Sequence, residues 1–138
     1  MKVRDLMTPR PVTVSPYDEL EVAISAMVRH RIRELPVLED GGLVGIITDR
    51  DVKMALGPDA RHLDLGSIDP RQLEGSVEWF MTAGVETVSH DTSVADATEE
   101  MLALRVGALP VVDDEEQLVG ILSVTDVLRA AVPLLRGA

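Results

Sequence analysis

The chain contains the same sequence pattern twice, and this internal repeat limits its architecture more than any other feature. Met7-Thr8 recurs as Met81-Thr82, and Leu35-Pro36-Val37 recurs as Leu109-Pro110-Val111, at a common offset of 74 positions (81 minus 7). Repetition at a fixed spacing indicates two copies of one supersecondary unit. A copy of about 60 residues is marginal for a core of its own, so we expect each copy to bury apolar surface on the other.

Each copy predicts the element order β-α-β-β-α. In the first copy a β-branched strand is expected over 11–14, and Asp18 is expected to cap a helix, with Glu21 at capping-box spacing. A hairpin over 35–47 and a second helix from Thr48 follow. The first helix has one apolar face in each copy. These faces comprise Leu20, Ala23, Ile24, Met27 and Val28, and in the second copy Val94, Ala97, Thr98, Met101 and Leu102.

The expected fold class is therefore α/β of the α+β kind, with two β-α-β-β-α units related by a pseudo-two-fold axis. We assign residues 1–60 to the first unit, 61–76 to a connector and 77–134 to the second unit. The connector has little periodicity, and we expect in it one short helical turn near 70–73. Several apolar residues fall outside the two predicted cores and need cover. They are Trp79, Phe80, Val132, Leu134 and Leu135.

Composition narrows the possible functions. Hydrophobic residues make up 46% of the chain and aromatic residues only 2%, so the core must be aliphatic and aromatic platforms for single-stranded nucleic acid are scarce. The net charge of −11 repels phosphate backbones and disfavours nucleic-acid binding. Residues 1–74 hold 10 of the 13 basic side chains, so an anion site should take its positive charge mainly from the first copy.

Other simple features exclude further classes. The chain has no cysteine, which rules out disulfides and thiolate metal sites. The charged segment MKVRDLM does not resemble a signal peptide, and no apolar run is long enough to span a membrane. We therefore expect a cytoplasmic protein without membrane contact. His62 and His90 have no neighbours at ligand spacing, so we interpret both as isolated surface residues and expect no metal site.

The motifs in order, rather than any one alone, resemble a known family. Both copies resemble cystathionine-β-synthase (CBS) domains, and the chain resembles a stand-alone CBS-domain pair, or Bateman module. The resemblance rests on Leu6-Met7-Thr8, Thr13-Val14-Ser15-Pro16, Leu35-Pro36-Val37 and the segment Gly45 to Asp51. It rests equally on their counterparts Phe80-Met81-Thr82, Thr87-Val88-Ser89, Leu109-Pro110-Val111 and the segment Gly120 to Asp126.

The resemblance implies a regulatory module that senses adenine nucleotides or adenosyl compounds: AMP, ADP, ATP, NAD or S-adenosylmethionine. It requires no cofactor and transmits its state to a partner protein. In such pairs each cleft is shared between the two copies. The first strand and the Leu-Pro-Val segment of one copy hold the adenine, and the helix start of the other copy holds the ribose and phosphates.

Thr48-x-x-Asp51 and Ser123-x-x-Asp126 each open a helix, and two interpretations of this spacing stay open. An ionised Asp can accept hydrogen bonds from a ribose diol while the first helical turn receives a phosphate. The same spacing is also a capping box, in which the Asp only satisfies the N-terminus of its own helix. Arg50 stands inside the first motif and can fork onto a phosphate, whereas Thr125 takes that place in the second.

The resemblance and these differences give two candidate ligand sites. Site 1 is the better phosphate site and comprises Thr48, Arg50, Asp51, Thr82, Thr87, Arg105, Val106, Gly107, Ala108 and Pro110. Site 2 comprises Thr8, Thr13, His30, Arg31, Ile32, Arg33, Pro36, Ser123, Thr125 and Asp126. In site 2 the bulky pair Arg33-Glu34 replaces Gly107-Ala108 and can fill the pocket. The basic residues at the end of the first helix also suit a helix C-terminus without any ligand.

An enzyme and an interaction scaffold are the alternatives to a ligand sensor. An enzyme is disfavoured because the chain has no cysteine nucleophile, no Gly-x-Ser-x-Gly, no His-Glu-x-x-His and no Walker loop. An interaction scaffold, whose clefts are filled by side chains and take no ligand, remains as the alternative. The resemblance also implies a homodimer formed through helical faces, which would cover the apolar residues outside the cores.

Overall fold

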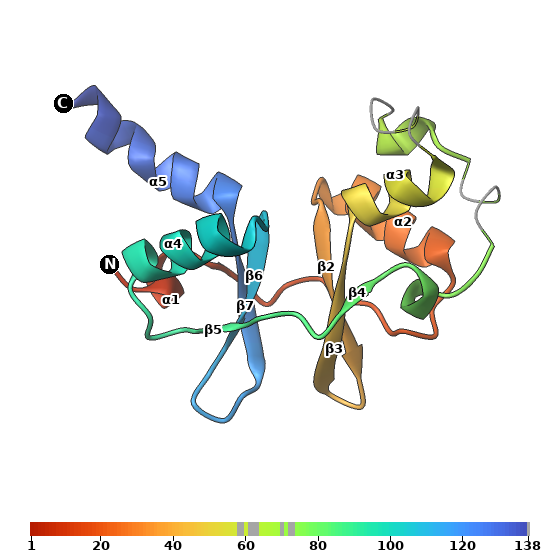
Figure 1. The fold of residues 1–138 in the computed structure, drawn as a ribbon, viewed down its shortest axis with the longest axis horizontal. Coiled ribbons are helices and arrows are strands. Elements are labelled where there is room, and N and C mark those ends of the chain that lie inside the picture. The colour runs from red at the N-terminus through yellow and green to blue at the C-terminus, as the bar shows by residue number, and fades with distance from the viewer. Residues whose placement is uncertain (58–59, 61–63, 70, 72–73, 138) are drawn as a thin grey trace. The chain divides into compact units, whose positions relative to one another are not determined.

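The computed structural model describes residues 1–57, 60, 64–69, 71 and 74–137. Its backbone contacts divide the chain into two compact units. One is Val12–Val85, and the other combines Met1–Pro11 with Glu86–Ala138. These units do not coincide with the two sequence copies. Each unit takes the short segment that opens the other copy, so the chain crosses twice between them (Figure 1).

The unit Val12–Val85 is built on an antiparallel hairpin. Strands β2 (Glu34–Glu39) and β3 (Gly42–Thr48) pair directly, and β4 (Thr82–Ala83) extends the sheet antiparallel to β3. Helices α2 (Leu20–His30) and α3 (Asp49–Leu56) cover one face of this sheet (Figure 1). The described part of this unit also contains the short 3-10 helices η2 (Leu65–Ser67) and η4 (Val77–Trp79).

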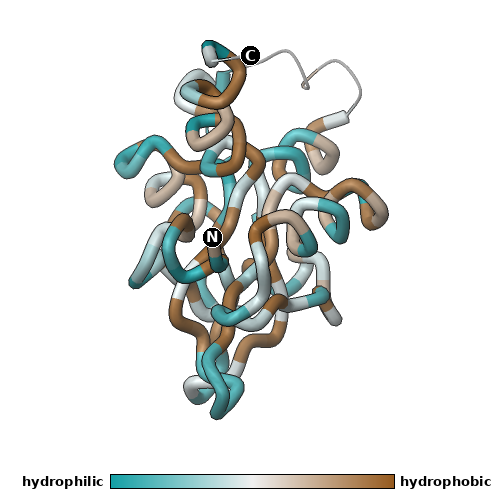
Figure 2. Tube along the Cα trace, turned by 90° about the vertical axis from the view of Figure 1, so that its left-hand side faces the viewer, coloured by the Kyte–Doolittle hydropathy of each residue, from teal (hydrophilic) through white to brown (hydrophobic). Residues whose placement is uncertain are grey.

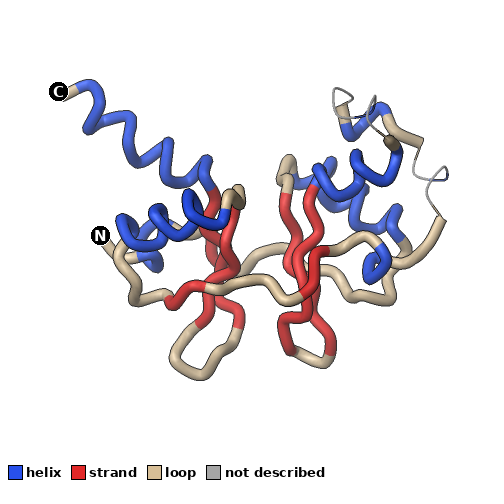
Figure 3. The backbone as a smooth tube through the Cα atoms, in the orientation of Figure 1, coloured by secondary structure: helices blue, strands red, loops and turns tan. Residues whose placement is uncertain are grey.

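The second unit repeats this plan with one more strand. Its sheet has the order β1-β7-β6-β5, with β6 and β7 forming the hairpin, β5 parallel to β6 and β1 antiparallel to β7. The strands are β1 (Thr8–Pro9), β5 (Val88–Ser89), β6 (Ala108–Val112) and β7 (Leu118–Ser123). The helices are α1 (Val3–Leu6), α4 (Val94–Leu104) and α5 (Val124–Arg136) (Figure 3).

Two glycines allow these exchanged segments to dock, which are residues 1–11 of the first copy and residues 77–85 of the second. A Cβ atom at Gly45 would lie 2.8 Å from the Met81 sulfur and 2.8 Å from the Thr82 carbonyl oxygen. At Gly120 it would lie 2.5 Å from the Met7 sulfur and 2.9 Å from the Thr8 carbonyl oxygen. Any larger residue would therefore push β4 or β1 off its neighbouring strand. The recurrence of Gly and Met-Thr in both copies follows from this shared packing.

Each unit has its own aliphatic core, as the composition predicts. Apolar residues run along the hairpin strands, and the hairpin turns are hydrophilic (Figure 2). The first core contains Val14, Leu20, Ala23, Ile24, Met27, Leu35, Val37, Ile47, Val52 and Val77. The second contains Val3, Val88, Ala97, Met101, Leu109, Val111 and Leu122. Val77 and Val3 belong to exchanged segments, so each core depends on residues from the other sequence copy.

Several local expectations need correction. The strand expected over 11–14 is reduced to one parallel bridge between Val14 and Val37. Asp18 does not cap α2, because the helix begins at Leu20 with Glu19 as its cap, and the Asp18 carboxylate instead accepts a hydrogen bond from Ser15 N. Phe80 packs partly buried against the first core and needs no cover. Of the helical turn expected at 70–73, residues 70, 72 and 73 lie outside the described part.

The apolar helix faces are narrower than expected. Leu20, Ala23, Ile24 and Met27 are buried, but Val28 is 46% exposed, and Leu102 in α4 is 73% exposed. At 3.6 residues per turn Val28 lies about a quarter turn from the centre of the buried stripe, which explains its exposure. Among the described residues, no helix has the length and apolar character that crossing a membrane requires.

Candidate functional site

The N-terminus of α3 places two of the predicted site residues side by side. Thr48 is the N-cap, and its hydroxyl oxygen accepts a hydrogen bond from Asp51 N at 3.1 Å. In return Asp51 Oδ2 accepts from Thr48 N at 3.0 Å. The capping-box interpretation of Thr48-x-x-Asp51 is therefore confirmed. This box uses only one of the two carboxylate oxygens.

The second oxygen of Asp51 faces the exchanged strand β4. Thr82 Oγ1 lies 3.4 Å from Asp51 Oδ1, which is long for a hydrogen bond between a hydroxyl and a carboxylate. Asp51 is only partly buried. Oδ1 therefore keeps the capacity to accept stronger hydrogen bonds, while Oδ2 keeps the carboxylate in a fixed position. Capping and ligand binding are compatible roles for this residue.

The other unit reproduces the arrangement at α5. Ser123 Oγ accepts from Asp126 N at 3.1 Å, and Asp126 Oδ2 accepts from Ser123 N at 3.0 Å. Thr8 Oγ1, on the exchanged strand β1, lies 3.5 Å from Asp126 Oδ1. Asp126 is 8% exposed and is the buried charged side chain of the described chain. Buried carboxylate oxygens are usually well hydrogen-bonded, so the weak contact of Asp126 Oδ1 is unusual and leaves this oxygen able to accept further hydrogen bonds.

The helix starts offer less to a phosphate than the sequence alone implies. Asp49 N, the first N–H of α3, donates to the Arg33 carbonyl oxygen at 2.9 Å, and the third N–H is held by Thr48. In α5, Val124 N likewise donates to the Gly107 carbonyl oxygen at 2.9 Å. Two of the first three N–H groups of each helix are thus already used. A phosphate would have to rely mainly on basic side chains.

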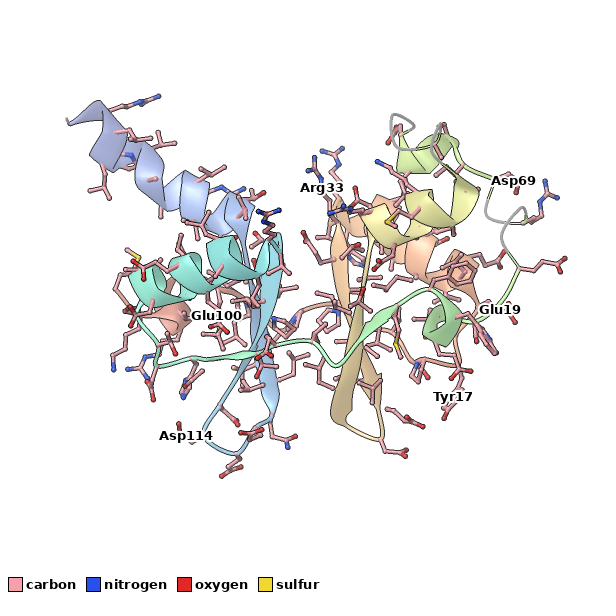
Figure 4. All side chains as sticks on the ribbon, in the orientation of Figure 1. Tyr17, Glu19, Arg33, Asp69, Glu100 and Asp114 are labelled. Carbon is pink, nitrogen blue, oxygen red and sulfur yellow. The ribbon has the colours of Figure 1, made fainter. Side chains whose placement is uncertain are left out.

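Basic residues lie at the C-terminal ends of the equivalent helices α2 and α4. Arg31 ends α2 and Arg105 ends α4, both in the left-handed backbone conformation, with φ of 53° and 57°. Glycine is the usual residue at such a position, since a side chain there is strained. His30, Arg33 and Arg50 are also exposed, and Figure 4 shows Arg33 near the end of β2 that follows α2.

The two compact units divide each predicted site. From site 1, Thr48, Arg50, Asp51 and Thr82 belong to Val12–Val85, whereas Thr87, Arg105, Val106, Gly107, Ala108 and Pro110 belong to the other unit. From site 2, Thr8, Ser123, Thr125 and Asp126 share one unit, whereas Thr13, His30, Arg31, Ile32, Arg33 and Pro36 belong to Val12–Val85. Within one unit, the structure brings together the Asp, the Thr or Ser that caps its helix, and the Thr of the exchanged strand. The assignment of the remaining residues to each site stays a prediction.

The sequence-based interpretation of His90 is wrong. His90 is not an isolated surface residue: its side chain is 21% exposed, and its Nε2 lies 3.5 Å from Asp91 Oδ2 and 3.5 Å from Asp114 Oδ1. Asp114 comes from the turn between β6 and β7, so no short sequence spacing could reveal this cluster. His62 lies outside the described residues.

Comparison with known proteins decides the family. The model of the CBS domain matches residues 3–57 and 75–133, which together include both sequence copies. The chain belongs to the CBS-domain family. This CBS-domain pair is 31% identical over 124 residues to the CBS domain-containing protein YhcV of Bacillus subtilis, with 90% of this chain and 81% of YhcV covered.

Other relatives are longer than this chain. The CBS-domain pair is 33% identical to the uncharacterized protein MJ1225 of Methanocaldococcus jannaschii, covering 92% of this chain but 46% of MJ1225. It is 38% identical to the inosine-5'-monophosphate dehydrogenase of that organism, of which it spans only 21%. The chain therefore spans less than half the length of these relatives, and the similarity to enzymes is confined to their CBS regions.

Solved CBS pairs share the fold over nearly the whole chain. The CBS domain pair of protein MJ0100, in complex with 5'-methylthioadenosine and S-adenosyl-L-methionine, has a TM-score of 0.79 and 28% identity, with 94% of each chain covered. CBSX2 of Arabidopsis thaliana, in complex with AMP, has a TM-score of 0.77 and 32% identity, with 96% of this chain and 97% of that chain covered. The tandem CBS-pair fold expected from the sequence is confirmed.

Proposed function

We propose that this chain is a regulatory module that binds an adenosyl ligand and passes its bound state to a partner protein. The observation that carries the proposal is the Asp-Thr pair at each helix start. In both units a capping box fixes one carboxylate oxygen, and the other oxygen faces a Thr hydroxyl at 3.4 Å or 3.5 Å. A fixed acceptor of this kind suits a vicinal ribose diol. Related pairs crystallised with AMP and with S-adenosyl-L-methionine support the ligand class.

We rank the half-site at α3 above that at α5. Arg50 is exposed at the second position of α3, whereas Thr125 occupies that position in α5. Because the backbone N–H groups are mostly engaged, the guanidinium of Arg50 is the main attraction for a phosphate at this end of the unit. Arg50→Ala should therefore weaken ATP and ADP binding more than adenosine binding.

The decisive experiment compares Asp51→Ala with Asp126→Ala by calorimetry with AMP, ADP, ATP, NAD and S-adenosylmethionine. Loss of the diol acceptor should weaken binding by about ten- to a hundredfold, which corresponds to roughly 1.5–3 kcal/mol. We expect the larger loss for Asp51→Ala. Phosphate release is measured in parallel, and its presence would favour an enzyme.

Both substitutions also remove part of a helix cap, so stability needs a matched control. Ser93 caps α4 by accepting from Asp96 N at 3.0 Å and belongs to neither predicted site. Ser93→Ala should lower stability by about 1 kcal/mol and leave ligand affinity unchanged. If Asp51→Ala behaves like Ser93→Ala, with lower stability and unchanged affinity, the carboxylate is only a cap and the site assignment fails.

The exposed surface of α5 favours a protein–protein contact as well. Val124, Leu128, Val132 and Leu135 recur on one helix face and are 42–71% exposed. A continuous apolar stripe on an amphipathic helix is typical of an interface. We propose that a second copy of the chain covers this stripe. If none of the adenosyl compounds binds, the scaffold alternative would rest on this surface.

A further inference from the structure

We propose that His90, Asp91 and Asp114 form a binding site for a divalent transition-metal ion, for which Zn²⁺ is the natural probe. The three side chains each offer one ligand atom, and these atoms all lie within 4.8 Å of one another. All three residues belong to the unit formed by Met1–Pro11 and Glu86–Ala138. The site is distinct from the helix starts that carry the proposed adenosyl site.

The imidazole nitrogen is the feature that a ligand would explain. His90 Nε2 is fully shielded from solvent and has no hydrogen-bond partner among the described residues. It nevertheless lies 3.5 Å from a carboxylate oxygen of Asp91 and 3.5 Å from one of Asp114. The buried nitrogen has no hydrogen bond, and the two carboxylate oxygens face it at a distance that allows all three atoms to bind one cation. Buried polar atoms are otherwise almost always satisfied.

The backbone holds the ligand-bearing turn in place. His90 N donates to the Val112 carbonyl oxygen at 2.9 Å, and the His90 carbonyl oxygen accepts from Arg4 N at 3.0 Å. Asp91 N donates to Ser89 Oγ at 3.2 Å. The turn is thus fixed to β6 on one side and to α1 on the other. Metal-ligating side chains on a backbone that is already fixed lose little conformational freedom when an ion binds.

The charges around Asp91 leave one of its oxygens for the ion. Asp91 Oδ1 pairs with Arg4 Nη1 and with Lys2 Nζ, the latter at 3.7 Å. The other oxygen of Asp91, Oδ2, is the one near His90. Asp113 is not available, because its Oδ1 accepts hydrogen bonds from Glu115 N and Gln117 N in the same hairpin turn. Asp114 projects from the tip of that turn (Figure 4) and is 83% exposed.

The other unit has a direct hydrogen bond between side chains at the corresponding place. There the turn after the first strand holds Pro16 and Tyr17, and Tyr17 N donates to Ser15 Oγ at 3.2 Å, as Asp91 N does to Ser89. The Tyr17 hydroxyl donates to the Glu39 carboxylate in the β2–β3 turn. This hydrogen bond and the charge of Glu39 raise the pKa of Tyr17. Only the second unit places an imidazole and two carboxylates at this location.

The donor set indicates the class of ion. One imidazole nitrogen with two carboxylate oxygens is a set that Zn²⁺ accepts, with water as a fourth ligand. Mg²⁺ prefers oxygen ligands only and octahedral geometry, so the imidazole argues against it. An ion here would join the turn at His90 to the β6–β7 hairpin and stabilise this unit.

The test is calorimetric titration of the tag-free full chain with ZnCl₂ in a chelator-free buffer. We expect saturable binding of one ion and a rise in melting temperature that EDTA reverses. His90→Ala and Asp114→Asn should each weaken binding by about tenfold or more. Asp40→Asn, at the matching position of the other hairpin turn, should leave binding unchanged.

Two further measurements keep the result decisive. Circular dichroism of each variant without metal checks that the fold is intact, and His90→Gln provides a second variant if His90→Ala is misfolded. A titration with MgCl₂ tests for attraction to the acidic turn alone. The proposal is overturned if no stoichiometric Zn²⁺ binding occurs, or if His90 variants bind Zn²⁺ as the wild type does. Equal binding of Mg²⁺ and Zn²⁺ would also overturn it.

Discussion

At the scale of single residues, Asp51 and Asp126 combine a structural and a proposed functional role. Each uses Oδ2 to cap its own helix and keeps Oδ1 facing a Thr hydroxyl on an exchanged strand. The cap therefore fixes the direction of the remaining acceptor. A side chain held in this way loses little entropy when a ligand binds. The two interpretations of the Thr/Ser-x-x-Asp spacing are consequently not exclusive.

Arg31 provides a residue-scale prediction about strain. Because its left-handed conformation disfavours a side chain, Arg31→Gly should stabilise the protein by up to about 1 kcal/mol. Arg29→Gly, inside α2, is the matched control and should destabilise it by about 1 kcal/mol. Both are measured by chemical denaturation. If Arg31 also contacts phosphate, its replacement lowers ATP affinity while it raises stability; destabilisation equal to that of Arg29→Gly would contradict the strain argument.

At the scale of elements, the short strands β1 and β4 matter more than their length implies. Each has two residues, yet each brings a Thr hydroxyl to a carboxylate and a Met side chain to a glycine of the neighbouring strand. Segments from the other sequence copy therefore complete each sheet and place a Thr hydroxyl beside the Asp at each helix start. Stability and the candidate site are coupled through the same strand pairing.

Gly45→Ala tests this coupling. The new Cβ would meet the Met81 sulfur and the Thr82 carbonyl oxygen at 2.8 Å, and the carbonyl belongs to a backbone that cannot simply rotate away. We expect a loss of about 1–3 kcal/mol in unfolding free energy, together with weaker adenosyl binding. Gly42→Ala is the control, since its Cβ would meet only the Glu39 carbonyl oxygen at 3.5 Å. Similar stability of the two variants in urea would show that β4 docks loosely.

At the scale of the whole molecule, the exchange makes the two sequence copies interdependent. Val77 is fully buried in the core of the first unit, and its N–H donates to the Asp18 carbonyl oxygen at 2.8 Å. Leu20 N donates to the Gly75 carbonyl oxygen at 3.0 Å. A cut between the copies removes these partners and leaves the N-terminal segment without the sheet on which it docks.

Fragments of the chain test this dependence. We expect residues 1–70 to show no cooperative melting, because this fragment lacks β4 and Val77 and carries β1 without β7. Residues 12–85 follow the compact unit and should retain more helical signal by circular dichroism. A cooperative transition of fragment 1–70, or equal signals from both fragments, would contradict the exchange as a source of stability.

The proposed homodimer belongs to the same scale. Leu128→Glu places a charge within the exposed apolar stripe of α5 and should convert a dimer to a monomer, as measured by light scattering at micromolar concentration. Leu102→Glu, at a leucine of α4 that is 73% exposed and lies outside this stripe, is the matched control and should leave the dimer intact. A monomeric wild type would refute the proposal.

The sequence by itself determined the repeat, the α-β-β-α order that follows the first expected strand of each copy, the aliphatic cores and both capping boxes. These features depend on neighbours a few residues apart, so periodicity and spacing reveal them. Only the tertiary structure decided that Val28 and Leu102 face outward, that Val14 forms a single bridge, and that His90 meets Asp114. It also decided which unit receives Met7-Thr8 and which receives Met81-Thr82. Because both copies carry the same Gly and Met-Thr motifs, either pairing satisfies every local rule, and the choice depends on long-range packing that the repeat cannot distinguish.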